Sequence, residues 1–321
     1  MTRPSSVPPP VTAVLDASSR WLPARLGEVE ELLRATIGGH GEALGTDAAA
    51  TLEAGGKRLR PMLVLLCAGP EGDGRAVRAA TAIELVHMAT LVHDDVLDDA
   101  PLRRGLPTVA ATSGRDRAVA TGDLLFSRAF ALLADAGDSR SVALLADASV
   151  ALARGELAQR HDAFDLGLDE ERYLSRCRLK TARLFECACL LGRPDEALRE
   201  FGAGIGLAFQ LLDDVLDVSG PPERTGKARG TDLLDGTVTL PLIEASKSDP
   251  TIREIELLAL DAASAEALCD RIAATGALER VRARAIEMVA GAKAALQGAE
   301  FAPEQRQLLT LVADGVVQRY S

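Results

Sequence analysis

The chain has 321 residues, of which 47% are hydrophobic and 26% are charged. A chain of this length and composition can bury a large core and is expected to fold into one or two domains. The formal net charge of -11 at pH 7 argues against a nucleic-acid-binding protein, which would need a basic surface to neutralise phosphates. The same negative charge disfavours unaided binding of anions. If the ligand is a phosphate ester, acidic side chains are expected to reach it through divalent cations, while a few local Lys and Arg residues make direct contacts.

The first ten residues, MTRPSSVPPP, are polar and rich in proline, so residues 1–10 are expected to form a disordered tail. The longest apolar run near the tail, Met62 to Ala68, is far shorter than the ~20 residues needed to span a bilayer. Five cysteines form no CxxC pair and no cluster flanked by histidine, which favours neither a zinc site nor a disulfide framework. The sequence predicts a cytoplasmic protein whose contact with membranes is at most peripheral.

Residues 11–321 predict a single all-α domain. Apolar residues recur at spacings of three and four, and the strand-like alternation of Val, Ile and Thr is nearly absent. Breaks rich in Gly, Pro, Asp and Ser divide this pattern at 69–75, 100–108, 135–141, 192–196 and 219–231. None of these breaks has the length or low complexity of an interdomain linker, so one helical bundle is expected.

The first segment with a chemical signature is GGKRLRP at 55–61. Two glycines allow a tight backbone turn before Lys57, Arg58 and Arg60, and Pro61 suits the first turn of a following helix. Cations are disfavoured near a helix N-terminus, so this placement predicts a bound anion. The alternative is an ordinary basic start of a helix.

The string DDVLD occurs twice, and each copy interrupts an apolar helical pattern. On a helix, positions i and i+4 share a face and position i+1 lies about 100° further round, so each copy offers two or three carboxylates in one sector. Carboxylates with buried flanks are costly unless a cation compensates them, and ligands that are all oxygen fit Mg²⁺. The alternative is a solvated acidic face. The predicted magnesium ligands are Asp94, Asp95, Asp98, Asp213, Asp214 and Asp217.

Basic and polar residues accompany the two acidic clusters. Arg103 and Arg104 follow the first cluster in a loop, where they either contact a diphosphate through their planar guanidinium groups or form surface salt bridges. His87 lies two helical turns before Asp94, as either a core histidine or a ligand. The remaining candidates are Lys180, Thr181 and Gln210 in apolar helical stretches, and Lys227 in a GKARG loop that could close over a bound diphosphate.

Seven segments between about 50 and 245 resemble the trans-isoprenyl diphosphate synthase family, also called polyprenyl synthetases. They are GGKRLRP, the first DDxxD with its RRG, GDLLF, KTA, FQLLDDVLD, GKARGTDL and TLP. The resemblance implies an all-α bundle with a central active-site cavity, where the two aspartate helices face each other, and usually a homodimer. It implies a Mg²⁺-dependent prenyltransferase that condenses an allylic diphosphate with isopentenyl diphosphate in successive head-to-tail steps to an all-trans polyprenyl diphosphate.

The same resemblance assigns a role to each candidate. The six aspartates would bind Mg²⁺ and the allylic diphosphate, and Thr181 and Gln210 would temper the allylic cation. Many relatives carry a lysine before TLP where this chain has residues 236–239, GTVT, although long-chain members often lack it too. The other assigned contacts are Arg103, Lys180, Gln210 and Lys227 to the allylic diphosphate, and Lys57, Arg58, His87 and Arg104 to isopentenyl diphosphate.

The residues before the first cluster bear on the length of the product. In short-chain relatives, an aromatic side chain at the fifth position before the first aspartate closes the floor of the product pocket. This chain has Ala89 at that position, followed by Thr90. No aromatic Phe, Tyr or Trp occurs between Trp21 and Phe126. A long product is therefore expected, with Phe126 or Phe130 either as deeper floors of the pocket or as ordinary core residues.

Three alternatives to a long-chain synthase stay open at this point. A short-chain farnesyl or geranylgeranyl diphosphate synthase would differ in product length alone. A class I terpene cyclase normally carries an Asn/Ser/Glu type of second motif and needs no site for a second diphosphate, so the second DDVLD and GGKRLRP count against it. A non-catalytic partner subunit would be expected to have lost acids from one cluster, and both clusters are intact.

Overall fold

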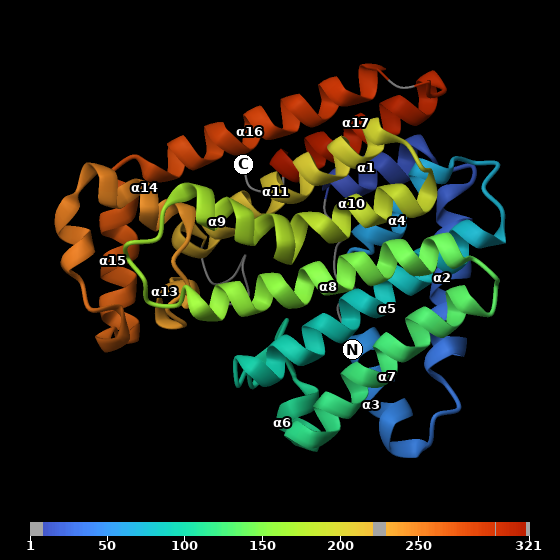
Figure 1. Ribbon diagram of the computed structural model, residues 1–321, viewed down its shortest axis with the longest axis horizontal. Coiled ribbons are helices and arrows are strands. Elements are labelled where there is room, and N and C mark those ends of the chain that lie inside the picture. Colours follow the sequence, from blue (N-terminus) through green and yellow to red (C-terminus); the bar gives the residue numbers. More distant parts are fainter. Residues whose placement is uncertain (1–8, 221–228, 299, 319–321) are drawn as a thin grey trace. The chain divides into compact units, whose positions relative to one another are not determined.

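The computed structural model describes residues 9–220, 229–298 and 300–318, and these residues are mostly helical (Figure 1). The described strands are β1 (Leu102–Arg103) and β2 (Leu106–Pro107), an antiparallel pair in which Leu102 lies opposite Pro107. The predicted all-α fold is confirmed. The first helix begins at Pro9, inside the segment expected to be a tail. None of the described helices is long and apolar enough to cross a membrane.

The chain divides into two compact units that alternate along the sequence. Unit 1 comprises Met1–Ser149, Cys187–Arg199 and Glu300–Val312, and unit 2 comprises Val150–Glu186, Glu200–Ala299 and Ala313–Ser321. Four of the described helices contribute residues to both units. They are α8 (Ser139–His161), α10 (Arg183–Gly192), α11 (Glu196–Ser219) and α17 (Pro303–Gln318). The single domain expected from the sequence stays a prediction.

Unit 1 is built around α5 (Gly74–Leu97). The carboxylate of Asp73 accepts a hydrogen bond from the backbone N–H of Arg75 and so caps the start of this helix. Every residue from Ala79 to Val86 is buried, which marks α5 as a core helix rather than an amphipathic one. Helix α7 runs beside α5 in Figure 1. The other helices of this unit are α1 (Pro9–Ala17), α2 (Leu22–Ile37), α3 (Glu42–Glu53), α4 (Leu59–Ala68), α6 (Val109–Ser113) and α7 (Arg115–Ala134).

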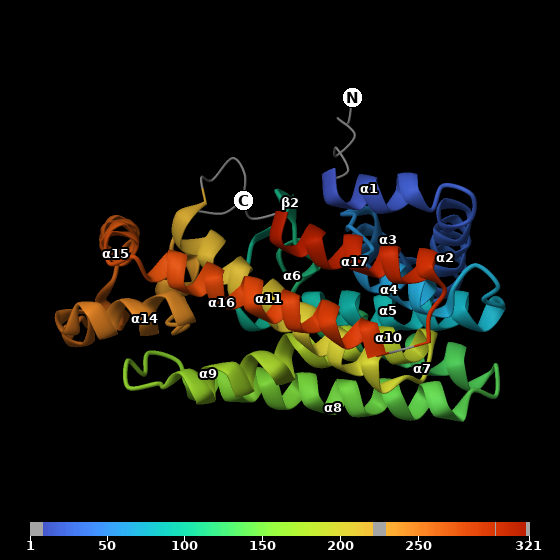
Figure 2. The same cartoon turned by 90° about the horizontal axis from the view of Figure 1, so that it is seen from above.

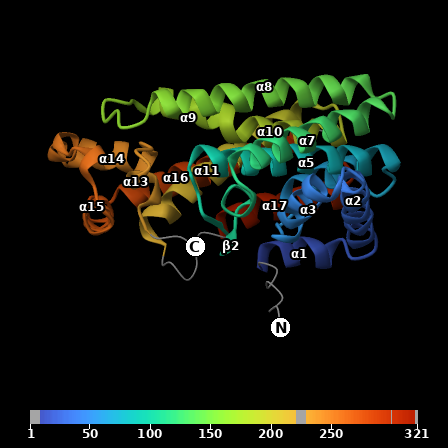
Figure 3. The same ribbon diagram turned by 90° about the horizontal axis from the view of Figure 1, so that it is seen from below.

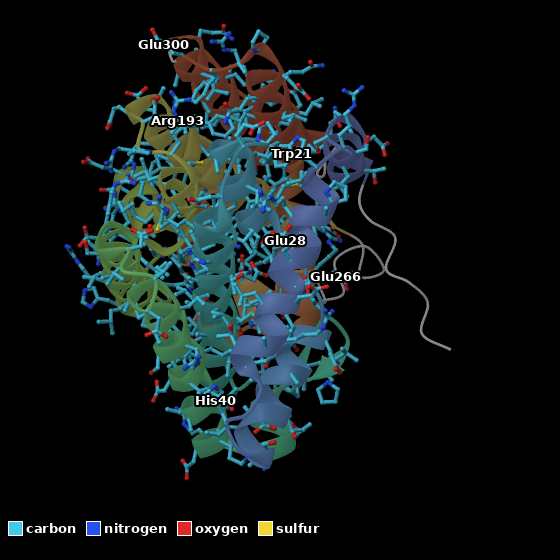
Figure 4. The ribbon with its side chains drawn as sticks, turned by 90° about the vertical axis from the view of Figure 1, so that its right-hand side faces the viewer. Trp21, Glu28, His40, Arg193, Glu266 and Glu300 are labelled. Atoms are coloured by element: carbon cyan, nitrogen blue, oxygen red, sulfur yellow. The ribbon has the colours of Figure 1, made fainter. Side chains whose placement is uncertain are left out.

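Segments distant in sequence complete unit 1. Gln305 donates from Nε2 to the carbonyls of Leu66 and Cys67 at 2.8 and 2.9 Å, which satisfies two carbonyls at the C-terminal end of α4. Arg193 donates to the carbonyl of Glu300 at 3.1 Å, and Figure 4 labels both residues. Figure 4 also labels Trp21, Glu28 and His40, which follow the course of α2. Figure 3 shows α3 beside α2.

Unit 2 surrounds the greater part of α11. A Cβ atom at Gly206 would lie 2.7 Å from the Cα of Ala182, and one at Gly204 would lie 2.9 Å from the Cβ of Ala292. Only glycine leaves room for neighbours at these distances, so α11 is closely enclosed on two sides. Figure 2 shows α14 beside α15. The remaining elements are α9 (Glu170–Cys177), the π-helical turn Arg178–Ala182, α13 (Thr231–Leu234), α14 (Leu240–Ser248), α15 (Ala262–Ala274), α16 (Ala277–Ala295) and the 3₁₀ turns Pro250–Glu254, Leu257–Ala259 and Leu296–Gly298.

Candidate active site

The first acidic cluster occupies the C-terminal end of α5. Asp98 is the residue that ends the helix, and its backbone N–H donates to the carbonyl of Asp94 at 2.8 Å. Asp94 is partly exposed and Asp98 is exposed, and the two share one helix face. Asp95 is buried, and its carboxylate accepts a hydrogen bond from Nε of Arg103 at 2.7 Å. The first and fifth carboxylates of this motif are therefore accessible, while the second is held by the protein.

His93, which precedes Asp94 in the chain, attaches this end of α5 to α7. Its Nε2 atom lies 3.3 Å from the carbonyl oxygen of Val119 and 3.6 Å from the carboxylate of Asp123. Its ring stacks on Phe126 with the ring centroids 5.9 Å apart. A Cβ atom at Gly122 would lie only 2.1 Å from His93 Nε2, so this glycine leaves the space that the imidazole fills. Three residues of the GDLLF segment at 122–126 therefore pack around the His93 ring and hold the end of α5.

The expected product-length residues lie on these same two helices. Ala89 is fully buried, and the partly buried Thr90 donates from its hydroxyl to the carbonyl of His87 at 2.8 Å. Phe126 is partly exposed and lies beside His93, directly next to the acidic cluster, and Phe130 follows one turn later on α7. The roles of the two Phe residues as floors of a pocket stay predictions.

The basic segments at 55–61 and 103–104 meet in unit 1. A Cβ atom at Gly56 would lie 3.0 Å from Nη1 of Arg58 and 3.4 Å from Nη1 of Arg104. The guanidinium group of Arg58 is engaged with protein partners, because it donates to Glu30 at 2.5 Å and to Glu84 at 2.8 Å. Arg58 adopts a left-handed conformation with φ 47°, directly before α4. The contact of Arg58 with isopentenyl diphosphate stays a prediction. Its ion pairs with Glu30 and Glu84 link the start of α4 to α2 and α5.

Positive charge surrounds His87. Burial lowers the pKa of His87 well below its ordinary value, and Arg60, Arg104, Arg103 and Arg58 lower it further in that order. His87 is therefore a neutral group among arginines at pH 7. Arg60 is the largest of these four influences, although sequence analysis had not singled it out as a ligand, and its burial lowers its own pKa to about 10. Lys57, in contrast, is exposed.

The second acidic cluster lies near the C-terminal end of α11, and its second carboxylate is again the buried one. Asp214 accepts hydrogen bonds from the hydroxyl of Tyr173 and from Nε2 of Gln210, the latter at 2.8 Å. The hydroxyl of Thr181 donates to Oε1 of Gln210 at 2.6 Å. Tyr173, Asp214, Gln210 and Thr181 thus form a continuous network that fixes the orientation of the Gln210 amide. No motif in the sequence marks Tyr173 as a member of this network.

The first and fifth residues of the second cluster are the accessible ones. Asp213 is exposed, and Asp217 is partly exposed and accepts a hydrogen bond from the backbone N–H of Asp232 at 3.2 Å. Burial raises the pKa of Asp214 above its ordinary value, and the nearby carboxylate of Asp232 raises it further. Asp232, in the GTDL segment, is a further carboxylate at this cluster that sequence analysis had not named.

The segment at 236–239, which lacks the lysine of many relatives, is held from within unit 2. The backbone N–H of Phe164 donates to the carbonyl of Gly236 at 2.7 Å, and a Cβ atom at Gly236 would lie 2.4 Å from the Phe164 ring. The buried guanidinium of Arg176 donates to the carbonyl of Val238 at 2.6 Å. Lys227 lies outside the described residues.

The donor atoms of both clusters suit a hard divalent cation. Each motif offers two accessible carboxylates at positions i and i+4, at the negative end of a helix, and oxygen-only ligands of this kind fit Mg²⁺. Within 9–220, 229–298 and 300–318, no group of three or more His, Cys, Asp or Glu side chains is already arranged to hold a metal. Two carboxylates with water and substrate phosphates match the way in which Mg²⁺ is usually bound.

Comparisons with known proteins agree with this arrangement. A model of the polyprenyl synthetase family matches residues 42–274. Heptaprenyl diphosphate synthase component 2 from Geobacillus stearothermophilus is 39% identical over 278 residues, which cover 83% of this chain and 87% of that relative. Octaprenyl diphosphate synthase from Escherichia coli K12 is 37% identical over 281 residues, with coverages of 83% and 86%.

A solved structure has the same fold. Polyprenyl synthase from Caulobacter crescentus CB15, complexed with calcium and isoprenyl diphosphate, aligns with a TM-score of 0.90 and 34% identity over 97% of this chain and 98% of that one. The helical architecture and the paired aspartate motifs thus define an enzyme with the isoprenoid synthase fold. The chain belongs to the polyprenyl synthetase family and is a prenyltransferase, as the sequence predicted.

Proposed function

We propose that this chain condenses an allylic diphosphate with isopentenyl diphosphate in successive head-to-tail steps and releases a long all-trans polyprenyl diphosphate. The repeated DDVLD motif, with its first and fifth carboxylates accessible in both copies, is the observation that carries the proposal. Two relatives support it by name, since one is a component of a heptaprenyl diphosphate synthase and the other is an octaprenyl diphosphate synthase. The calcium and isoprenyl diphosphate in the Caulobacter structure support a divalent cation as the partner of the substrate.

Mg²⁺ is the proposed cation, and all six aspartates belong to its site. Asp94, Asp98, Asp213 and Asp217 are proposed to contact it directly because they are the accessible ones. Asp95 and Asp214 are proposed to keep the motifs in place through their hydrogen bonds to Arg103, Tyr173 and Gln210. When bound, Mg²⁺ would neutralise charge on the leaving diphosphate.

The basic residues are proposed to divide the two substrates between them. Arg103, Lys180, Gln210 and Lys227 would hold the allylic diphosphate, and Thr181 would act through its hydrogen bond to Gln210. Lys57, His87 and Arg104 would hold isopentenyl diphosphate together with Arg60, and Arg58 would support them from its ion pairs. Positive charge on the leaving group lowers the barrier to breaking the allylic C–O bond.

The double bond of isopentenyl diphosphate then attacks the allylic cation, and the released diphosphate accepts the proton lost in the final step. Fixing both substrates in one orientation supplies a further part of the acceleration. Excluding water keeps the cation from being hydrolysed.

Substitution of single aspartates tests the metal assignment. Asp94→Ala and Asp213→Ala should each lower turnover of farnesyl diphosphate and labelled isopentenyl diphosphate by orders of magnitude, with the helical circular dichroism unchanged. Asp99→Asn is the matched control, because Asp99 belongs to the same acidic run but is exposed outside the DDVLD motif. Near-normal turnover in either Ala variant would contradict the assignment.

Sizing the dephosphorylated products tests the product length. Products of at least about six isoprene units are expected, because the buried position before the first cluster holds the small Ala89, where an aromatic side chain would limit a pocket. A product that stops at about three or four units would show a short-chain synthase instead.

The assembly and the location of the enzyme are also proposals. We propose a homodimer that works in the cytoplasm and touches membranes at most when it releases its product. The relative from Geobacillus is named as one component of a synthase, so dependence on a second protein is the alternative. Release of diphosphate by the purified chain alone, together with its mass from light scattering, distinguishes these two states.

A further inference from the structure

Lys180 is held by a carboxylate that sequence analysis did not consider. Its Nζ atom lies 2.5 Å from Oε2 of Glu156 on α8, and Nε of Arg160 donates to the other oxygen, Oε1, at 3.1 Å. The side chains of Lys180 and Glu156 are 28% and 17% exposed, so the pair is largely shielded from water. Burial alone would raise the pKa of Glu156, yet that pKa lies below its ordinary value because Lys180 and Arg160 favour the charged form.

The backbone fixes this pair in place. Gly155 precedes Glu156, and a Cβ atom at Gly155 would lie 2.5 Å from the backbone nitrogen of Lys180 and 2.8 Å from its Cα. Helix α8 therefore touches the main chain at Lys180 itself. Lys180 also lies within the π-helical turn Arg178–Ala182, a rare conformation that often marks functional sites. Glu156 faces Lys180 because of how the two helices pack, and all these residues belong to unit 2.

A carboxylate in this place competes with any anion that binds Lys180. The lysine ammonium is a compact charge with three donors, and one of its directions is already taken by Glu156. A diphosphate that approaches Lys180 meets a charge that is partly neutralised, together with the like charge of the carboxylate. The contribution of Lys180 to the affinity for diphosphate is then small, and substrate binding depends on the other contacts of the site.

We propose that Glu156 is a positioning residue that holds Lys180 in the site and lowers its affinity for diphosphate, so that the inorganic diphosphate released in each condensation can leave. The inference rests on the proposed function, in which Lys180 contacts the allylic diphosphate. Each added isoprene unit releases one diphosphate ion, and the next allylic diphosphate needs the same place. A synthase that adds many units therefore gains from a diphosphate site that does not hold the released ion tightly.

The substitution Glu156→Gln tests the inference, because it keeps the size of the side chain and removes its charge. The dissociation constant of inorganic diphosphate, measured by calorimetry on the full chain in MgCl₂, should fall by a factor of about 5–30, the effect expected for a partly buried charge pair. Inhibition of turnover by added diphosphate should strengthen by a similar factor. Glu156→Asp keeps the charge but moves it away from Nζ, so a smaller tightening is expected.

The variant Lys180→Gln separates the possible results. In its background, Glu156→Gln should no longer change the dissociation constant, because the effect acts through Lys180. An unchanged or weaker affinity in Glu156→Gln alone would overturn the inference, as would an equal tightening without Lys180. If Lys180→Gln binds diphosphate as the wild type does, then Lys180 is not a ligand, and its role in the proposed function fails together with the inference.

Discussion

The contact between Gly122 and His93 allows a quantitative test of how the first acidic cluster is positioned. In Gly122→Ala, the new Cβ atom would lie 2.1 Å from His93 Nε2, whereas ordinary contact begins at 3.4 Å, so the ring must move by about 1.3 Å. That movement breaks the stacking on Phe126 and the contact with the carbonyl of Val119. Overpacking of this kind costs about 1–3 kcal/mol, which urea unfolding followed by circular dichroism can measure.

Turnover should suffer as well, since Asp94 follows His93 directly. A displacement of about 1 Å at a catalytic group can cost roughly 100-fold in rate, so a loss of about 10- to 100-fold is expected. Removing the ring in His93→Ala/Gly122→Ala should relieve the clash, with an interaction free energy of at least about 0.5 kcal/mol in the double-mutant cycle.

Gly27→Ala is the matched control for this cycle. Gly27 lies in α2, and a Cβ atom added there would have nothing within 4 Å. Alanine at this position should raise the free energy of unfolding by about 0.5–1 kcal/mol. Wild-type stability of Gly122→Ala, or strict additivity in the double variant, would refute the reasoning.

Three further outcomes are expected. Tyr173→Phe should lower the free energy of unfolding by about 1–3 kcal/mol, because the buried Asp214 loses a donor; an unchanged urea midpoint would argue against the network. Folding lowers the pKa of His87, so below about pH 6.5 the unfolded chain binds a proton there that the folded chain does not. The free energy of unfolding should therefore fall by up to about 1.4 kcal/mol for each unit by which the pH is lowered in this range. His87→Gln should flatten that part of the curve, and identical curves would contradict the shift. Gly236→Ala should lower the thermal midpoint, because φ is +71° and the Phe164 ring fills the Cβ position; a midpoint equal to the wild type would contradict it.

The sequence is sufficient to predict what depends on local pattern. The apolar spacing predicts an all-α chain, and the positions of both DDVLD motifs on helices follow from it. The inward direction of Asp95 and Asp214 could also have been predicted, since the second aspartate lies about 100° round the helix from the first. Arg60 belongs to the same GGKRLRP segment as Arg58, so its place among the basic residues around His87 was also predictable.

Partners that are distant in sequence could not be predicted from local pattern. Arg58 looks like a free ligand until folding brings Glu30 and Glu84 to it, from 28 and 26 residues away. Tyr173 is an ordinary apolar position of α9 in the sequence, and only the packing against α11 makes its hydroxyl a partner of Asp214. A π-helical turn has no established residue pattern, so the turn at 178–182 could not be predicted from the sequence either.

The two DDVLD motifs share one further property, which is their place on their helices. Both α5 and α11 have 24 residues, and both carry their acids near the end where backbone carbonyls have no intrahelical partners. The partial negative charge of that end, about half an elementary charge, adds to the charge of the carboxylates. Carboxylates at such an end repel one another and the helix end, so a divalent ion that binds them stabilises the folded chain and is thermodynamically linked to folding. The melting temperature should accordingly rise with the concentration of MgCl₂ in the absence of any substrate, so a simple thermal melt reports on the metal sites independently of catalysis.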